Sequence, residues 1–334
     1  MPRVLVAPAP LREIEHTYEP ILKAAGYQVE YPPRRDFLTE VQMTEEELLA
    51  QLPGCVASLA GSEPYTRKVI AAAAPKGLKV IARAGVGYDA IDLAAATDHG
   101  VAVCFAPGTN QDAVAEHTYM LMLALVRNFR EQDTGIRRGE WPRRAVGPLR
   151  GTTLGIVGLG RIGKAVARRA AVFGMEVLAA EIAPDHEFCR VNNVTLVAFE
   201  ELLRRSDVVS LHVPKTPQTK YMVNRKSLAL MKPTAFLINT SRGGVVHEGD
   251  LYEALTAKRI AGAALDVFES EPPAGSPLLG LDNIILTAHT AGVDRRSREE
   301  MARLPAQAIV KLLAGEWPAE WVVNPQVKEK FFAR

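Results

Sequence analysis

Three titratable residues in the second half of the 334-residue chain each follow a short apolar run. Arg242 comes after FLINTS, Glu271 after AALDVFES, and His289 after NIILTA. Such runs are typical of strands buried on both faces of a parallel sheet, and these sheets bind ligands beyond the carboxyl ends of their strands. We therefore expect a guanidinium, a carboxylate and an imidazole to meet at one edge of a sheet.

This set of side chains suits hydride transfer to a 2-keto acid. The arginine can bind the substrate carboxylate and polarise the carbonyl group. The imidazole can donate the proton that the nascent alkoxide needs, and a neighbouring carboxylate orients the ring and favours its protonated form. Each residue alone is common at the end of a strand, so the interpretation depends on a cofactor site nearby.

The stretch GIVGLGRIG, near the middle of the chain, supplies that cofactor site. It places Gly158, Gly160 and Gly163 in a GxGxxG pattern directly after an apolar strand and directly before a helical pattern. The first glycine permits a tight turn, the second lets the backbone approach a pyrophosphate, and the third allows close packing of helix on strand. We expect the cofactor to contact these glycines together with Arg161 and Ile162.

The strand after this turn, MEVLAAE, ends at Glu181. An acidic residue at that point can accept hydrogen bonds from the hydroxyl groups of the adenine ribose, and it repels a 2′-phosphate. The residues that follow, IAP, include no arginine that could bind such a phosphate. The sequence therefore favours NAD over NADP.

Short β-branched runs alternate with helical patterns along nearly the whole chain, which predicts strand–helix–strand units and doubly wound parallel sheets. One series of units occupies residues 1–105, and a second runs from about residue 150 to about residue 290. A long helix, from about Asp112 to Arg130, lies between them, and a final helix near Ser297 to Leu313 follows. Because that final helix comes after a finished sheet, we expect it to pack on the first series.

The predicted fold class is therefore α/β, with an NAD-binding, doubly wound parallel sheet inserted into a discontinuous substrate domain. The predicted boundaries are residues 1–105 and 298–334 for the substrate domain and residues 106–297 for the NAD-binding domain.

The composition argues against other classes of function. Forty basic side chains face 38 acidic ones, so the net charge of +2 gives no reason to expect nucleic acid or a membrane as partner. No apolar run approaches the ~20 residues that span a bilayer, and the N-terminus does not have the pattern of a signal peptide. No HxxxH or HExxH spacing indicates a metal site. Widely separated cysteines predict reduced thiols in a cytoplasmic protein: Cys55, Cys104 and Cys189.

The other histidines carry no predicted role. His117 lies within the long predicted helix, and His212 ends a strand at the same edge but has no acid near it in the sequence. The densest basic stretch, RRGEWPRRAVGPLRG, is interpreted as a solvated connector or a subunit contact.

Several long motifs resemble, in the same order, those of the D-isomer-specific 2-hydroxyacid dehydrogenases, which include D-3-phosphoglycerate dehydrogenase and glyoxylate/hydroxypyruvate reductase. They are RAGVGYDAID, PGTNQDAVAEHT, GLGRIG, HVPKTPQT, NTSRGGVVHEGDL, AGAALDVFESEPP and LTAHTAG. The resemblance covers nearly the whole chain. It implies two Rossmann-like domains, with the NAD-binding domain inserted into a flavodoxin-like substrate domain, and a homodimer built through the long helix.

The resemblance also implies a role for each matching residue. Arg242 binds the substrate, Glu271 supports His289, and His289 is the acid and base of the reaction. Asp266 holds the nicotinamide amide, and further NAD contacts fall on Val213, Pro214, Thr240, Ser241 and His289. The substrate carboxylate is bound by backbone amides at Val86 and Gly87, with Asn110 also facing the substrate.

Departures from the family pattern bear on the substrate. Phosphoglycerate dehydrogenases often carry an arginine where this chain has Ala60 and Gly61, so we expect a small acid of the glyoxylate or hydroxypyruvate type. D-3-phosphoglycerate dehydrogenase remains the alternative, because Lys215 or Arg83 could hold a phosphate. A more distant alternative is a non-enzymatic, NAD-sensing protein of the corepressor type. Glu181 stands where the family usually has aspartate, and His247 and Ala288 also depart from the pattern without removing a catalytic atom. Because the sequence stops soon after VVNP, we expect none of the regulatory domain that longer relatives carry.

Overall fold

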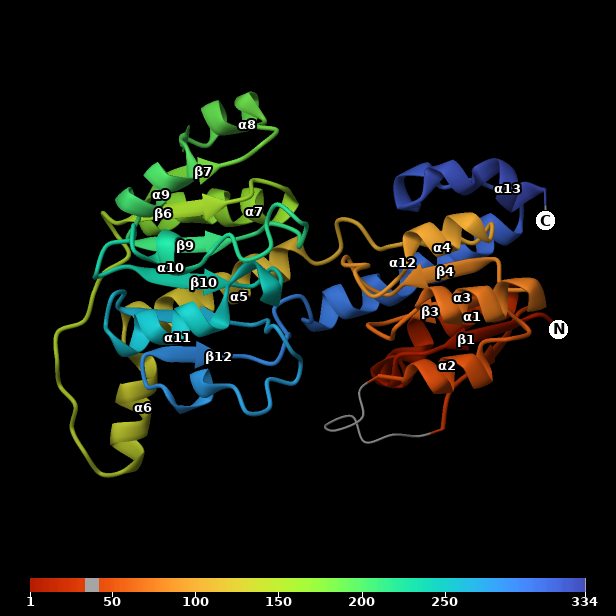
Figure 1. Ribbon diagram of the computed structural model, residues 1–334, viewed down its shortest axis with the longest axis horizontal. Coiled ribbons are helices and arrows are strands. Elements are labelled where there is room, and N and C mark those ends of the chain that lie inside the picture. The colour runs from red at the N-terminus through yellow and green to blue at the C-terminus, as the bar shows by residue number, and fades with distance from the viewer. Residues whose placement is uncertain (34–41, 334) are drawn as a thin grey trace. The chain divides into compact units, whose positions relative to one another are not determined.

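The computed structural model describes residues 1–33 and 42–333, and it separates into two compact units (Figure 1). Unit 1 consists of Met1–Asn110 and Asp294–Arg334, and unit 2 consists of Gln111–Val293. The chain therefore leaves unit 1 after residue 110 and returns to it at residue 294. The predicted domain boundaries, after residues 105 and 297, lie close to these limits and remain a prediction.

Unit 1 is built on a parallel sheet in which the strand order is β2-β1-β3-β4-β5. Nearly every side chain of the central strand β3 is buried, because helices cover both faces of the sheet. This order is that of flavodoxin-like folds. The strands are β1 (Arg3–Val6), β2 (Gln28–Glu30), β3 (Cys55–Ala60), β4 (Val80–Arg83) and β5 (Ala102–Cys104).

One face of this sheet is covered by η1 (Ala9–Thr17), α1 (Glu19–Ala24) and α12 (Arg295–Leu313), and the other by α2 (Glu45–Gln51), α3 (Arg67–Ala73) and α4 (Leu93–Asp98). Apolar residues of α12 such as Ile309 and Leu312 pack in the same core as Val4 and Leu59 of the sheet. The final helix therefore completes the core of unit 1. Shorter helices of this unit are η2 (Ala74–Lys76), η6 (Ala319–Trp321), η7 (Pro325–Val327) and α13 (Lys328–Phe332).

Unit 2 is built on a longer parallel sheet in which the strand order is β12-β11-β10-β9-β6-β7-β8. The order reverses between β6 and β9, as in doubly wound dinucleotide-binding folds, which bind their ligand at that reversal. The strands are β6 (Thr153–Val157), β7 (Glu176–Ala180), β8 (Val194–Leu196), β9 (Val208–Leu211), β10 (Phe236–Asn239), β11 (Gly262–Leu265) and β12 (Ile284–Leu286).

Helices again cover both faces of the sheet in unit 2, so that each face has its own apolar core. One core contains residues of α5 (Gln111–Val126), α7 (Arg161–Ala170) and α8 (His186–Val191), and the other contains residues of α9 (Phe199–Arg205), α10 (Arg225–Leu228) and α11 (Glu248–Thr256). Short helical turns of this unit are η3 (Ala171–Phe173), η4 (Gly243–Val245) and η5 (Pro277–Gly280).

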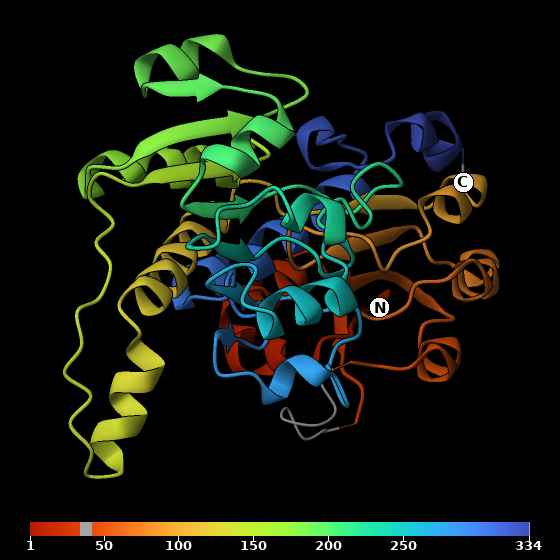
Figure 2. The same cartoon turned by 60° about the vertical axis from the view of Figure 1, so that its left-hand side comes forward.

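The long helix expected from Asp112 to Arg130 is two helices, α5 and α6 (Phe129–Arg137). The break falls at Asn128, whose φ of 48° is left-handed and cannot continue a helix. Figure 2 shows α6 and the segment after it projecting from the rest of unit 2. No helix within the described residues combines the length and the apolar composition needed to cross a membrane.

Candidate active site

The glycine turn between β6 and α7 is shaped by steric contacts that only glycine allows. Gly158 has a φ of 91°, and a Cβ atom added to it would lie 2.6 Å from the carbonyl oxygen of His212. A Cβ atom on Gly163 would lie 2.1 Å from the carbonyl oxygen of Gly158. A Cβ atom on Gly160 would meet nothing within 4 Å, so the backbone there faces open space.

The start of α7 fits the pyrophosphate of a dinucleotide. Gly160 occupies the N-cap position and offers no capping side chain, so the first amides of the helix, at Arg161 and Ile162, have no acceptor among the described residues. Amides at a helix N-terminus and the helix dipole favour an anion. Open space at Gly160 leaves room for that anion, and these residues therefore fit an NAD molecule.

The carboxylate of Glu181, directly after β7, contacts the same turn. One of its oxygens accepts a hydrogen bond of 2.6 Å from the backbone N–H of Leu159, and the other accepts one of 3.0 Å from the N–H of Ala183. A carboxylate oxygen can accept more than one hydrogen bond, so both remain able to accept from ribose hydroxyl groups. Glu181 thus joins the end of β7 to the turn that would hold the pyrophosphate.

His212 directly follows β9 and is hydrogen-bonded to a residue of that strand. Val213 and Pro214 come next in the chain. The Nε2 atom of His212 lies 2.9 Å from the hydroxyl oxygen of Ser210, and burial lowers the pKa of His212 to about 3. His212 is therefore neutral at physiological pH and cannot supply a proton as an imidazolium. The side chain of Val213 lies against Gly158, so this segment borders the glycine turn.

The loop after β10 carries Thr240, Ser241 and Arg242, and the side chain of Asn239 organises it. The Asn239 Oδ1 atom accepts from the N–H and the hydroxyl of Ser241, at 3.0 and 2.8 Å, while its Nδ2 donates to the Arg242 carbonyl at 2.8 Å. The Arg242 guanidinium donates to the Ser241 carbonyl. From α5, the Thr118 hydroxyl lies 3.2 Å from that of Thr240.

The loop after β12 is held by Asp266, which is fully buried at the end of β11. The Asp266 carboxylate accepts from the hydroxyl of Thr287 at 2.6 Å and from the N–H groups of Thr290 and Ala291 at 2.9 Å each. The Asp266 carbonyl accepts from the N–H of His289 at 2.8 Å. His289 itself has a φ of 52°, an unfavourable region for a non-glycine residue that these bonds stabilise.

Glu271 and His289 form a charge-assisted pair in which Nδ1 of the ring lies 2.7 Å from the Glu271 carboxylate. The other carboxylate oxygen of Glu271 accepts from the N–H of Phe268 at 3.1 Å. Burial alone would raise the pKa of Glu271, but the hydrogen bond and charge of His289, the Phe268 amide and the Arg242 charge together lower it. Glu271 is therefore an anion at neutral pH, and the Nε2 atom of His289 has no partner among the described residues.

Unit 2 thus brings Arg242, Glu271 and His289 to one edge of its sheet. The loop of Arg242 packs on that of Glu271, since a Cβ atom on Gly243 would lie 1.8 Å from the Phe268 carbonyl oxygen. The glycine turn and Glu181 lie at the same edge, on strands that continue this sheet.

Val86, Gly87 and Asn110 belong to unit 1. The first two follow β4, after Gly85 with a φ of 157°, and the structure gives their N–H groups no acceptor within the described part of the chain. Free amides in succession can bind a carboxylate. Asn110 is the last residue before the chain enters unit 2.

Sequence reasoning missed the residues that support the site, above all His117, Asn239 and Thr287. His117 lies 170 positions before Thr287, its hydrogen-bond partner, so no local pattern relates them. The role of Asn239 could have been predicted from the sequence. An Asn side chain at the end of a strand can accept a hydrogen bond from the backbone two residues further on, as Asn239 does from Ser241. Among the described residues there is no group of three or more His, Cys, Asp or Glu side chains that could hold a metal ion.

The chain matches known proteins over this region. The family model for "D-isomer specific 2-hydroxyacid dehydrogenase, NAD binding domain" matches residues 119–291. The chain is 43% identical over 286 residues to D-3-phosphoglycerate dehydrogenase of Methanocaldococcus jannaschii, covering 84% of this chain and 54% of that protein. It is 44% identical over 263 residues to glyoxylate reductase of Thermococcus litoralis, covering 76% of this chain and 79% of that protein.

A solved structure, D-lactate dehydrogenase of Aquifex aeolicus in complex with NAD and lactic acid, is similar with a TM-score of 0.83. It is 27% identical in sequence, and the match covers 96% of this chain and 99% of that chain. The chain spans only 54% and 60% of the length of two curated D-3-phosphoglycerate dehydrogenases, those of Methanocaldococcus jannaschii and Archaeoglobus fulgidus.

The position of Glu181 leads to a test of cofactor choice. In the Glu181→Gln variant we expect the NADH dissociation constant to rise about tenfold, equivalent to about 1.4 kcal/mol, because the ribose loses an anionic acceptor. NADPH should bind equally well or better, since the repulsion of its 2′-phosphate is removed. Fluorescence titration measures both constants. Glu187→Gln, which changes an exposed carboxylate paired with Arg190, is the control; an equal loss for the two cofactors would contradict the assignment.

Proposed function

Because the chain belongs to the D-isomer-specific 2-hydroxyacid dehydrogenase family, we propose that it transfers a hydride between NAD(H) and a small 2-keto or 2-hydroxy acid. The observation that carries this proposal is the pairing of Glu271 with His289 beside Arg242, at the sheet edge that also carries the glycine turn. When bound, NADH supplies the hydride.

The chain's own residues supply position, charge and a proton. Arg242 binds the substrate carboxylate and polarises the carbonyl group. The resemblance assigns substrate contacts to the backbone N–H groups of Val86 and Gly87 and to Asn110 as well. Since Nδ1 of His289 is engaged by Glu271, the proton that reaches the substrate oxygen is held at Nε2. The Glu271 anion stabilises the imidazolium that this step requires.

On the cofactor side, Gly158, Gly160, Gly163, Arg161 and Ile162 would hold the pyrophosphate, and Glu181 the adenine ribose. The resemblance assigns the remaining contacts to Val213, Pro214, Thr240, Ser241, Asp266 and His289. The Asp266 carboxylate already accepts hydrogen bonds from its own loop. A nicotinamide amide would therefore donate to a carboxylate that also binds these loop donors.

For the substrate we propose an acid of the glyoxylate or hydroxypyruvate type, which the similarity to a glyoxylate reductase supports. The alternative, 3-phosphoglycerate, is supported by the similarity to D-3-phosphoglycerate dehydrogenases. No arginine stands at Ala60 or Gly61, and the Arg83 guanidinium reaches the Ser62 hydroxyl at 3.5 Å. Phosphate recognition would therefore have to come from Arg83 or from Lys215.

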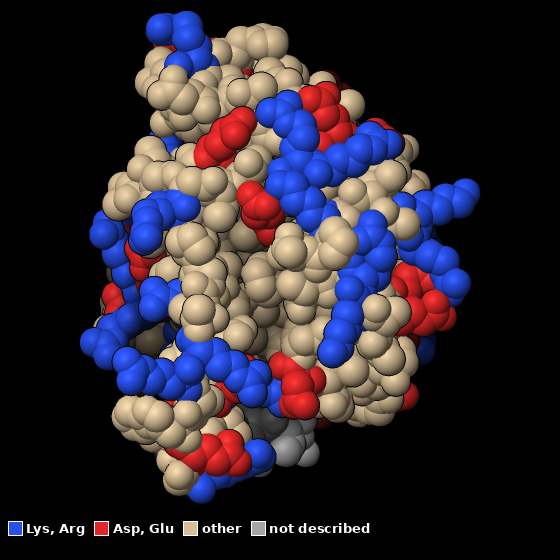
Figure 3. All heavy atoms as spheres, turned by 90° about the vertical axis from the view of Figure 1, so that its left-hand side faces the viewer, with Lys and Arg blue, Asp and Glu red and all other residues tan. Residues whose placement is uncertain are grey.

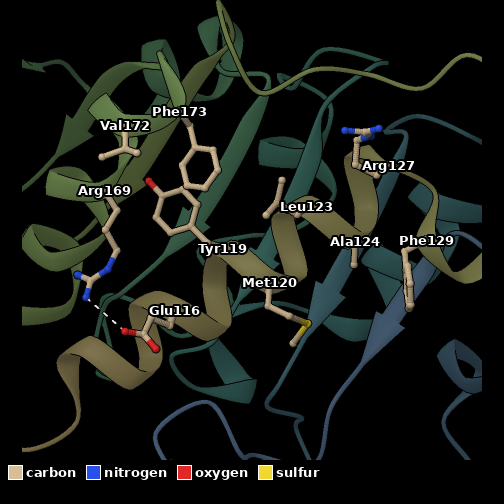
Figure 4. A pocket seen from close by; sticks show the side chains of 10 residues that line it. All are labelled: Glu116, Tyr119, Met120, Leu123, Ala124, Arg127, Phe129, Arg169, Val172 and Phe173. Carbon is tan, nitrogen blue, oxygen red and sulfur yellow. Dashed lines mark ion pairs between the residues drawn. The ribbon is translucent and has the colours of Figure 1, made fainter.

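We also propose a homodimer assembled through α5. This helix is apolar on nearly every side, which is typical of a helix covered on more than one face. Its outer side borders a hollow of about 710 Å³ (Figure 4), where Tyr119 stacks on Phe173 and where Met120, Phe129 and Val172 are exposed. On the face of the molecule drawn in Figure 3, lysine and arginine side chains lie around stretches of uncharged surface. An apolar patch of this kind fits a second copy of the chain.

For the cell compartment we propose the cytoplasm. The three cysteines are free and buried, and two lie in unit 1 while the third lies in unit 2, an arrangement typical of proteins in a reducing compartment.

A panel of 2-keto acids tests the proposed activity: glyoxylate, hydroxypyruvate, pyruvate and 3-phosphohydroxypyruvate, each with NADH and NADPH. We expect NADH-dependent reduction of a non-phosphorylated acid, and about 10²–10⁴-fold slower turnover in His289→Asn, with NADH binding unchanged. His16→Asn, an exposed histidine of unit 1, is the matched control. A higher kcat/KM for 3-phosphohydroxypyruvate would establish the alternative substrate. Binding of NADH without turnover of any acid would overturn the enzyme proposal in favour of an NAD-sensing protein.

The role of Glu271 is tested by pH dependence. Its pKa is lowered, so Glu271 is an anion throughout the neutral range and favours the imidazolium of His289 there. Reduction consumes that proton, and activity should fall as pH rises. In Glu271→Gln the favouring charge is lost, so the fall should move to lower pH. Initial rates of keto-acid reduction, measured from mildly acidic to alkaline pH, give this profile. An unmoved profile would remove Glu271 from this role.

The dimer is tested by placing a charge on the outer side of α5. Met120 is 45% exposed in the single chain, and Met120→Glu should convert a dimer into a monomer of unchanged thermal stability. Light scattering or sedimentation measures the mass. Leu279→Glu is the control, because Leu279 is 49% exposed but lies in η5, outside the hollow. A wild-type chain that is monomeric at micromolar concentration would contradict the proposal.

A further inference from the structure

His117, on the side of α5 that faces the sheet, contacts the loop that carries the proposed acid. Its side chain is 16% exposed, and its Nε2 atom lies 3.1 Å from the Thr287 hydroxyl oxygen and 3.6 Å from the Asp266 carboxylate. Neither the proposed chemistry nor the family motifs give this histidine a role. It is the one histidine besides His289 that the structure connects to that loop within the described residues.

The direction of these hydrogen bonds follows from the donors available. The Asp266 carboxylate accepts from two backbone N–H groups and, at 2.6 Å, from the Thr287 hydroxyl. Thr287 has a single hydroxyl hydrogen, and this bond uses it. The Thr287 oxygen must therefore accept from His117, which places a hydrogen on Nε2 of His117 whether the ring is neutral or protonated. The bonds run in one direction, from His117 to Thr287 to Asp266.

This chain of hydrogen bonds ends at the loop that positions His289. Asp266 binds the loop through its carbonyl, at the N–H of His289, and through its carboxylate, at Thr287, Thr290 and Ala291. It contacts no lysine or arginine among the described residues, so hydrogen-bond donors alone stabilise its buried charge. A change in the orientation of this carboxylate would move the loop and, with it, the imidazole of His289.

We propose that His117 is a positioning residue: through Thr287 and Asp266 it fixes the loop of residues 287–291 so that the ring of His289 keeps its place against Glu271. This inference rests on the proposed role of His289 as acid. His117 acts through its neighbours Thr287 and Asp266. Thr118, the next residue, contacts Thr240 in the Arg242 loop, so consecutive residues of α5 support both halves of the site.

The experiment compares four variants. His117→Leu removes the donor, whereas His117→Gln keeps an amide donor where Nε2 was. The other two are Thr287→Val and the His117→Leu/Thr287→Val double variant. In His117→Leu we expect kcat to fall about 10–100-fold, because misplacing a reacting group by about 1 Å has effects of this size. KM for the keto acid should change less than about threefold, against about tenfold or more for a lost binding contact. His117→Gln should recover most of kcat, and the double variant should be no slower than the slower single variant.

A second readout does not require turnover. The ring signals of His289 in a ¹H–¹³C spectrum, assigned by comparison with His289→Asn, should move in His117→Leu and return in His117→Gln. His16→Gln makes the same chemical change at an exposed site of unit 1 and should leave spectrum and kcat unchanged. If the wild type reduces no keto acid, the proposed function fails, and these spectra still decide whether His117 positions His289.

Three results would overturn the inference. The first is a His117→Leu variant with unchanged kcat and unchanged His289 signals. The second is a loss of kcat in His117→Leu that His117→Gln does not restore and that adds to the loss in Thr287→Val. If the thermal midpoint also falls, His117 would be a packing residue. The third is a rise in KM for the keto acid in proportion to the loss of kcat, which would make His117 a substrate contact.

Discussion

A buried carboxylate at the end of β11 organises the edge of the sheet on which the proposed chemistry depends. Asp266 is fully enclosed, and leaving it without partners would cost far more free energy than a folded domain can spare. It is satisfied by a hydroxyl and two backbone N–H groups from a single loop, and its carbonyl binds the N–H of His289. Those bonds outweigh the unfavourable left-handed backbone of His289 and determine where its ring can reach Glu271.

The rest of the site follows from the parallel sheet of unit 2. Since its strands run in the same direction, the glycine turn after β6, the acid after β7 and the loops after β10, β11 and β12 emerge at one edge. The reversal of strand order between β6 and β9 separates the connections there and leaves room for a ligand. Gly160 faces open space at this point, while Gly158 and Gly163 allow backbone contacts too close for any side chain.

Helix α5 contacts the loops of the proposed active site on one side and carries the proposed dimer surface on the other. Its inner side presents His117 and Thr118 to the loops of His289 and Arg242. Its outer side, with Tyr119 and Met120, borders an apolar hollow whose lining includes none of Arg242, Glu271 and His289. One helix therefore faces the proposed chemistry on one side and the proposed partner subunit on the other.

The sequence by itself determined the family, the α/β class and the presence of an NAD-binding domain, and the comparisons confirm each of them. These features are local: a glycine pattern or an apolar run followed by a polar residue has the same meaning wherever the chain places it. Only the tertiary structure decided that Asn128 ends the long helix, that Glu181 binds the Leu159 N–H, and that His117 contacts Thr287. These depend on packing between segments as much as 170 residues apart, and no pattern within one segment encodes such a distance.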